Sequence, residues 1–191
     1  ATTCSGGVVA ATAAANTFSL TGATVPANGS CVFRADVVAS TAGALTNVIA
    51  AGAIATGQGL TNPVPGTATL DVQLPPTVAK AFAPASIAIG GTSTLTITLG
   101  NANAADIALT SALVGALPGN VVIAATPNVV KTCPGAVTAD PGATTITYAI
   151  SATIPAGGCT IELDVTADLP GDYPNNIPAG ALKTGAGSNA D

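Results

Sequence analysis

The chain repeats itself along its length. Residues 24–39 (TVPANGSCVFRADVVA) match residues 153–167 (TIPAGGCTIELDVTA) with one residue deleted, and residues 45–59 match residues 174–187 in the same order. The shift between matching blocks is 128 to 129 residues. Self-similarity at a fixed spacing is the signature of a repeat architecture. The sequence is therefore built on a period of about 129 residues.

The phase of the repeat predicts how the chain is divided. Residues 75–131 have no counterpart before Cys4, and residues 62–73 have none after the second repeat. We interpret residues 1–74 as the back half of a first β-sandwich repeat, and residues 75–191 as a second repeat that lacks its last strand. Roughly one and a half repeats are present on this interpretation. Either the sequence is a fragment of a longer array, or it is a subunit that completes its domains with strands from neighbouring copies.

Alternation of apolar and polar residues at period two predicts the fold class. The clearest run has threonines facing one way and aliphatic residues the other: Thr92, Thr94, Thr96 and Thr98 against Leu95, Ile97 and Leu99. Residues 31–38, 67–72 and 160–166 alternate in the same way, and Pro-Gly and Gly-Gly turn signals separate such runs. These features are typical of an all-β sandwich with short strands. The Ala-rich residues 102–117 are interrupted by Thr, Val and Gly, which favours strand or loop over helix.

Four cysteines allow three disulfide pairings, or four reduced thiols. Cys4 and Cys31 are 27 residues apart and Cys133 and Cys159 are 26 apart, and the two pairs occupy equivalent places in the repeat. We therefore expect the disulfides Cys4–Cys31 and Cys133–Cys159. Their formation requires an oxidising compartment, which predicts an extracellular or cell-surface location.

The opening of the second repeat resembles a conserved repeat domain of bacterial cell-surface and secreted proteins, a domain of unknown function. The residues that carry the resemblance are Lys80, Phe82, Pro84, Gly90, Gly91, Ser93, Leu95, Ile97, Leu99 and Asn101, followed by the turn from Pro155 to Cys159 and the segment from Asn176 to Thr184. The resemblance covers nearly the whole chain. It implies immunoglobulin-like β-sandwich units in tandem arrays, and it brings no catalytic residues with it.

The composition excludes several classes of function. Only four residues are Lys or Arg and none is His, so the chain has no basic surface for nucleic acid and no histidine for metal binding or general base catalysis. No apolar run reaches the length of about 18 residues that a membrane span needs. Glu162 and Asp164 lie two apart on one predicted strand and could bind Ca²⁺, but Arg34 and Asp36 occupy the equivalent positions, which favours a solvent-facing strand. We expect no enzymatic activity, no cofactor and no metal.

The favoured function is a structural subunit of an extracellular filament. A sandwich that lacks an edge strand exposes unpaired backbone groups, and a strand from an identical subunit would complete it. The candidate donated strand consists of Thr67, Thr69, Leu70, Asp71, Val72 and Gln73. We expect the accepting groove near residues 160–165 or 95–99 of the second repeat.

Two other functions stay open at this stage. The chain could be a stalk repeat of a large adhesin or surface-layer protein, or a module that binds surface glycans through its few aromatic side chains: Phe18, Phe33, Phe82, Tyr148 and Tyr173. Lys80 lies in the predicted first strand of the second repeat, where a covalent cross-link is conceivable. Surface sandwiches sometimes join a first-strand lysine to a last-strand asparagine by an isopeptide bond, but because the last strand is missing we expect Lys80 to point to solvent.

Overall fold

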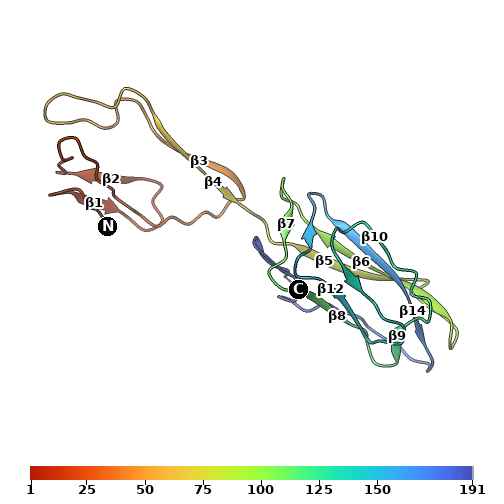
Figure 1. The fold of residues 1–191 in the computed structure, drawn as a ribbon. Coiled ribbons are helices and arrows are strands. Elements are labelled where there is room, and N and C mark those ends of the chain that lie inside the picture. The colour runs from red at the N-terminus through yellow and green to blue at the C-terminus, as the bar shows by residue number, and fades with distance from the viewer. Residues whose placement is uncertain (191) are drawn as a thin grey trace. The chain divides into compact units, whose positions relative to one another are not determined.

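The computed structural model describes residues 1–190, and all the regular structure in this range is β (Figure 1). The all-β class predicted from the sequence is confirmed. By their contacts the residues group into two compact units, Ala1–Thr41 and Ala42–Asp191. Each unit is described in turn below.

The first unit is small and has few strands. β1 (Val8–Ala11) and β2 (Phe18–Thr21) form an antiparallel hairpin in which Val8 is opposite Thr21. The disulfide Cys4–Cys31 and the tilted ring pair Phe18–Phe33, with centroids 5.6 Å apart, hold the rest of the unit together. Little apolar surface is buried in this unit, so the disulfide supplies part of the stability that a hydrophobic core would otherwise give.

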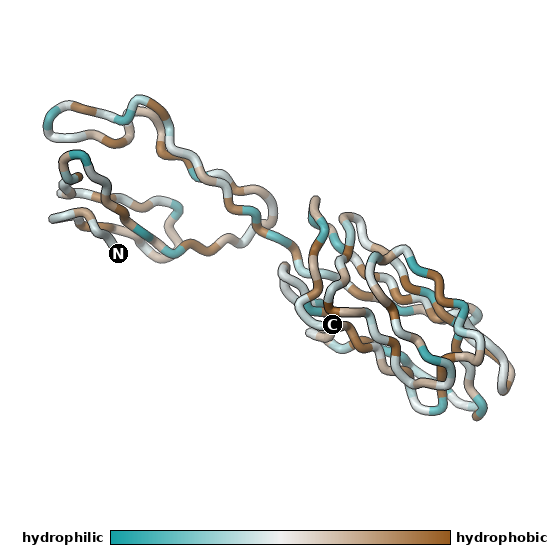
Figure 2. The backbone as a smooth tube through the Cα atoms, in the orientation of Figure 1, coloured by the Kyte–Doolittle hydropathy of each residue, from teal (hydrophilic) through white to brown (hydrophobic). Residues whose placement is uncertain are grey.

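The second unit begins with a two-stranded antiparallel ribbon. β3 (Gly43–Ile49) and β4 (Gly66–Val72) pair along their full lengths and with no other strand in the described chain. Leu45 is opposite Leu70 and Thr46 is opposite Thr69. Hydrophobic residues recur along both strands (Figure 2). Below, β3 and β4 together are called the ribbon.

The rest of the second unit is a sandwich of short sheets. Its strands are β5 (Thr77–Ala83), β6 (Thr92–Gly100), β7 (Ile107–Ala108), β8 (Leu113–Ala116), β9 (Val121–Ile123), β10 (Val130–Lys131), β11 (Val137–Thr138), β12 (Thr145–Tyr148), β13 (Thr153–Ile154), β14 (Cys159–Ala167), β15 (Lys183–Thr184) and β16 (Gly187–Ser188). The largest sheet has the order β10–β14–β6–β5, with β9 also paired to β14. A three-stranded sheet, β11–β12–β8, lies on the other side of the core, and β7–β13 and β15–β16 form small pairs.

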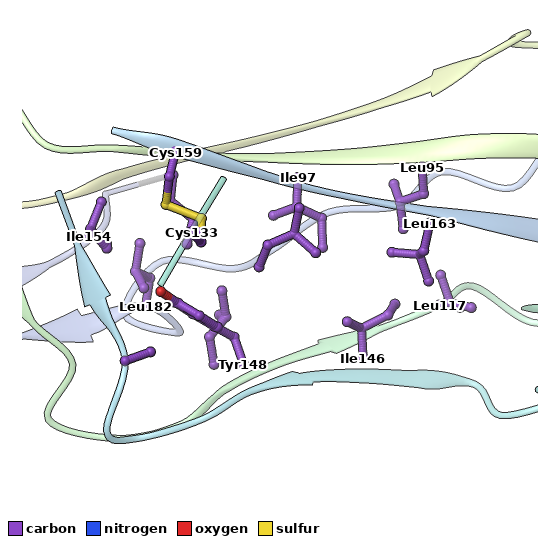
Figure 3. Close-up of a cluster of buried hydrophobic side chains, with 14 of the residues drawn as sticks. Leu95, Ile97, Leu117, Cys133, Ile146, Tyr148, Ile154, Cys159, Leu163 and Leu182 are labelled. Carbon is purple, nitrogen blue, oxygen red and sulfur yellow. A yellow bond between two sulfur atoms is a disulfide. The ribbon is translucent and has the colours of Figure 1, made fainter. Parts of the chain in front are cut away.

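The core lies between these two sheets. Figure 3 shows Leu95, Ile97 and Leu163 from the large sheet facing Ile146 and Tyr148 from the small one. Along β6 the residues Leu95, Ile97 and Leu99 are buried while the threonines between them are not, as the alternation predicted. β14 alternates in the same way over all nine of its residues. Period-two alternation thus places one face of each strand in the core.

Candidate functional site: open strand edges and inward polar groups

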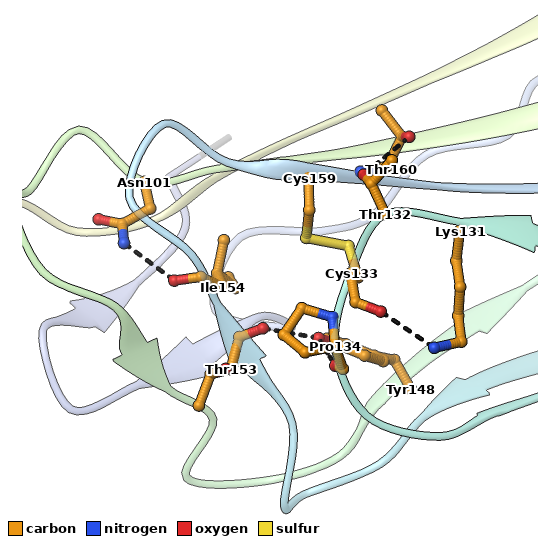
Figure 4. The surroundings of a disulfide bond; sticks show 10 residues. All are labelled: Asn101, Lys131, Thr132, Cys133, Pro134, Tyr148, Thr153, Ile154, Cys159 and Thr160. Carbon is orange, nitrogen blue, oxygen red and sulfur yellow. Dashed lines mark hydrogen bonds between the residues drawn. A yellow bond between two sulfur atoms is a disulfide. The ribbon is translucent and has the colours of Figure 1, made fainter.

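Both predicted disulfides are present, and none of the four cysteines is free. The Cα atoms are 4.9 Å apart in each pair. Cys133–Cys159 joins the loop before β11 to the start of β14, beside the hydroxyl of Tyr148 (Figure 4). That hydroxyl lies 2.6 Å from the carbonyl oxygen of Pro134 and 2.7 Å from that of Thr153. The polar atom of the largest core side chain is therefore satisfied inside the sandwich.

The two copies of the matched segment have different structures. Residues 159–167 form β14, which pairs with β6 on one side and with β9 and β10 on the other. The equivalent residues 31–39 form no strand, and only the bridge between Thr2 and Phe33 pairs them in β fashion. Val38 is 99% exposed. Residues 1–3 pair with residues 32–34 as β10 pairs with β14. The prediction of a strand at residues 31–38 is nevertheless wrong, because β6 and β9, the other strands that hold β14, have no counterpart in the first unit.

The candidate donated strand lies in the ribbon. Thr67 to Val72 belong to β4, and Gln73 follows it directly. Because residues opposite each other share a face of a sheet, Leu70 and Val72 lie on one face with Leu45 and Ile49, while Thr67, Thr69 and Asp71 lie on the other. On that second face the hydroxyls of Thr46 and Thr69 are 3.1 Å apart. Leu70 is nevertheless 48% exposed, so the described residues of the second unit leave the apolar face of the ribbon partly exposed.

The groove expected near residues 160–165 or 95–99 is not there. Those residues belong to β14 and β6, and each of these strands has a partner on both edges. One open edge of the large sheet is β5, since β5 pairs only with β6 among the described strands, and β10 and β9 lie at the other edge. A hollow opens beside it, lined by Val78, Ala79 and Lys80 of β5 and by residues 175–178. β5 is therefore one of the strands of the sandwich that leave backbone groups unpaired.

Lys80 does not point to solvent as expected. It lies on the same face of β5 as Val78 and Phe82, which pack against the core. A Cβ atom at Gly115 of β8, in the opposite sheet, would lie 3.6 Å from the Lys80 Nζ. The Lys80 Nζ donates a hydrogen bond of 2.7 Å to the Oδ1 of Asn175. Burial lowers the pKa of this amine to about 8.

The paired carboxylates on β14 are not assembled as a metal site. Asp164 accepts hydrogen bonds from the Thr94 hydroxyl at 2.9 Å and from the Asn128 amide at 2.7 Å. Glu162 is half-buried on the same outer face, opposite Thr96. Within residues 1–190 no group of three or more His, Cys, Asp or Glu side chains could hold a metal ion. Hydrogen bonding within the sheet therefore explains the half-buried contact between Asp164 and Thr94.

The aromatic residues do not gather on one face for sugar stacking. Tyr148 is buried, and Phe18 and Phe33 pack on each other. Phe82 and Tyr173 line a common hollow, at the end of the sandwich near residues 84–89 and 169–172. No helix within residues 1–190 has both the length and the apolar character to cross a membrane.

The comparisons with known proteins return a family without an assigned function. A family model described as "Domain of unknown function (DUF7933)" matches residues 1–72 and 76–191. No curated protein and no solved structure matches the chain. The fold and its contacts therefore supply the basis for a functional argument.

Proposed function

Since the chain belongs to the DUF7933 family, whose function is unassigned, we propose that it is a structural subunit of an extracellular filament that assembles head to tail by strand complementation. In this proposal the ribbon of one copy docks against the sandwich of the next, and the open edge of β4 pairs with the open edge of β5. This replaces the accepting groove expected from the sequence with one of the strand edges that the fold leaves free.

The exposed ribbon is the observation that carries the proposal. A two-stranded hairpin alone is marginally stable in water, and three or more strands with a buried face are needed for independent stability. The ribbon has two open outer edges and an apolar face on which Leu45 and Leu70 are 39% and 48% exposed. Addition of this ribbon to a larger sheet would supply backbone partners for β4 and cover that face.

The position of β5 in the chain explains why a second copy is the partner. Four residues, 73–76, separate β4 from β5, and two of them are the consecutive prolines Pro75 and Pro76. Proline fixes the backbone and holds the preceding residue in an extended conformation, so this connection opposes a tight hairpin between β4 and β5 of one chain. Pairing between β4 of one copy and β5 of another is heterologous, and a contact of that kind which does not close produces a filament.

Charge and disulfides agree with assembly outside the cell. Only 7% of the residues are charged, and so copies of the chain repel one another weakly. The two disulfides are consistent with an oxidising environment. The internal repeat favours a second candidate function, a stalk segment of a larger surface protein in which sandwich units follow one another along one polypeptide.

Electron microscopy of the purified chain, combined with electrophoresis in SDS without boiling, tests the filament proposal. We expect fibres and an SDS-resistant ladder. The double variant Leu70→Asp with Val72→Asp should abolish both, because it places charge on the apolar face of the ribbon. The matched control, Thr67→Asp with Thr69→Asp, adds the same charge to the opposite face of β4 and should retain fibres. A monodisperse monomer at high concentration, or equal loss of fibres in both variants, contradicts the proposal.

A further inference from the structure

Lys80 and Asn175 are held in contact although 95 residues separate them in the sequence. Lys80 extends from β5 into the sandwich, and Asn175 lies in the extended segment between β14 and β15. The Lys80 Nζ is 2.7 Å from the Oδ1 of Asn175, so the amine also lies close to the carbonyl carbon of that carboxamide. The geometry therefore brings a nucleophile to the carbonyl group of an amide.

The nitrogen of the same carboxamide has no partner. The Asn175 Nδ2 is buried and makes no hydrogen bond within the described structure. Leaving a buried N–H donor unsatisfied costs about 1–3 kcal/mol. The oxygen of the carboxamide thus has a hydrogen-bond donor, whereas its unpaired NH₂ group destabilises the fold. A reaction that removes this NH₂ group would relieve the cost.

The Lys80 amine can act as a nucleophile without a neighbouring base to remove its proton. Its lowered pKa of about 8 leaves a substantial neutral fraction near neutral pH, whereas an exposed lysine is almost fully protonated there. The carboxylates of β14 do not hold it in the charged form. Lys80 is opposite Ile97, which is opposite Ile161, so Glu162 and Asp164 lie toward the other side of the sheet or farther along it.

We propose that Lys80 and Asn175 form an intramolecular isopeptide bond. The neutral Nζ attacks the Cγ of Asn175, an N–C bond forms, and one Nζ proton passes to Nδ2, directly or through water in the hollow beside β5. The Cγ–Nδ2 bond then breaks and ammonia leaves. The products are one secondary amide and one ammonia, and neither an oxidant nor a reductant is needed. The bond ties the edge strand of the large sheet to the segment that closes the hollow.

The repeat supplies a matched asparagine that should not react. Asn47 is the equivalent of Asn175 at the shift of 128 residues. Asn47 is exposed in the ribbon, opposite Ala68. It has the same side chain as Asn175 and the equivalent place in the repeat, but no lysine amine against it. Asn47 therefore tests whether the loss of ammonia needs the contact with Lys80.

Intact-mass spectrometry of the whole chain tests the bond. The wild-type protein should be lighter than its sequence by one ammonia beyond the hydrogens lost in the disulfides, and fragmentation should give a branched peptide joining Lys80 to Asn175. Incubation at pH 9 should raise the linked fraction in freshly made protein above that at pH 6, because more of the amine is neutral.

Variants locate the reaction and separate it from assembly. Lys80→Met and Asn175→Ala should each restore the unshifted mass, whereas Asn47→Ala and Lys131→Met should retain the ammonia loss. Because mass is measured on denatured chains, a variant that folds poorly still gives a result, and the wild-type mass alone is decisive. An unshifted wild-type mass after incubation at pH 9, or an ammonia loss mapped to another residue, overturns the proposal whether or not filaments form.

Discussion

The side-chain amide of Asn101 donates a hydrogen bond to the carbonyl oxygen of Ile154, 2.9 Å away, and so joins the end of β6 to β13. The same amide nitrogen donates to the carbonyl oxygen of Ala105, and the Asn101 Oδ1 accepts from the backbone N–H of Asn103. Asn101 is only 3% exposed. One buried side chain therefore fixes the loop between β6 and β7.

Asn101→Ala is expected to destabilise the second unit by about 1–3 kcal/mol, because buried carbonyl groups lose their donor and the turn loses its acceptor. Urea unfolding followed by tyrosine fluorescence measures the change. Asn176→Ala, at an exposed asparagine, is the matched control and should unfold at the wild-type urea concentration. Equal midpoints for the two variants would contradict the structural role of Asn101.

Removal of the Tyr148 hydroxyl should also weaken the sandwich. Tyr148→Phe leaves the ring in the core but takes the donor from the carbonyl oxygens of Pro134 and Thr153. We expect a loss of about 1–2 kcal/mol in the free energy of unfolding. Tyr173→Phe is the control, since the Tyr173 hydroxyl bonds the carbonyl of Leu169 at an exposed site. Calorimetry should show the larger fall in Tm for Tyr148→Phe.

Alkaline pH should unfold the sandwich through the same tyrosine. Burial raises the pKa of Tyr148 to about 12, above its ordinary value of 10.0. The unfolded chain then loses its tyrosine proton before the folded chain does, so stability is lost as pH rises from about 10 to about 12. Tyr148→Phe should flatten this part of the stability curve. An unchanged slope between wild type and variant would rule out Tyr148 as the group responsible.

The two disulfides are expected to stabilise different parts of the chain. Replacement of Cys133 and Cys159 by Ser should lower the stability of the sandwich by about 3 kcal/mol, because the disulfide restricts the unfolded chain by closing a loop. The loop closed by Cys4–Cys31 in the first unit has a similar length. Replacement of Cys4 and Cys31 should leave the unfolding of the sandwich unchanged and increase amide exchange within residues 1–41. Loss of sandwich stability in both double variants would contradict this division.

Hydrogen exchange should distinguish the two copies of the matched segment. The backbone amides of β14 lie in a central strand with partners on both edges and are expected to exchange slowly. Those of residues 35–38 have no backbone hydrogen bond in the described structure and should exchange at close to the rate of an unfolded peptide. Peptide-level mass spectrometry of the monomer makes this comparison within a single sample. Comparable protection of both segments would show that residues 35–38 are paired after all.

Local sequence patterns predicted the features that depend on neighbours along the chain. The alternation in residues 92–99 predicted which side chains of β6 enter the core, and Thr67 to Val72 do lie in a strand. The similar spacing of the cysteines, 27 and 26 residues, predicted their pairing. Ala-rich residues 102–117 hold the short strands β7 and β8, as their Thr, Val and Gly residues indicated.

Features that depend on partner strands could not be predicted in this way. Residues 31–38 alternate like β14, but alternation does not supply the flanking strands that a buried strand needs. Lys80 was expected in solvent because the last strand of the second repeat, which would carry a partner asparagine, is missing. Its inward position follows from its place between Val78 and Phe82 on the core face of β5, and its contact with Asn175 spans 95 residues of sequence.

The short connection between β4 and β5 has a mechanical consequence. In a filament joined by β4 of one copy and β5 of the next, tension enters each subunit at β5 and leaves at β4, and only residues 73–76 lie between these strands. A pulling force would therefore travel along the ribbon and one edge strand and largely bypass the rest of the sandwich. Each junction would be loaded in shear along its strands, the direction in which many backbone hydrogen bonds must break together.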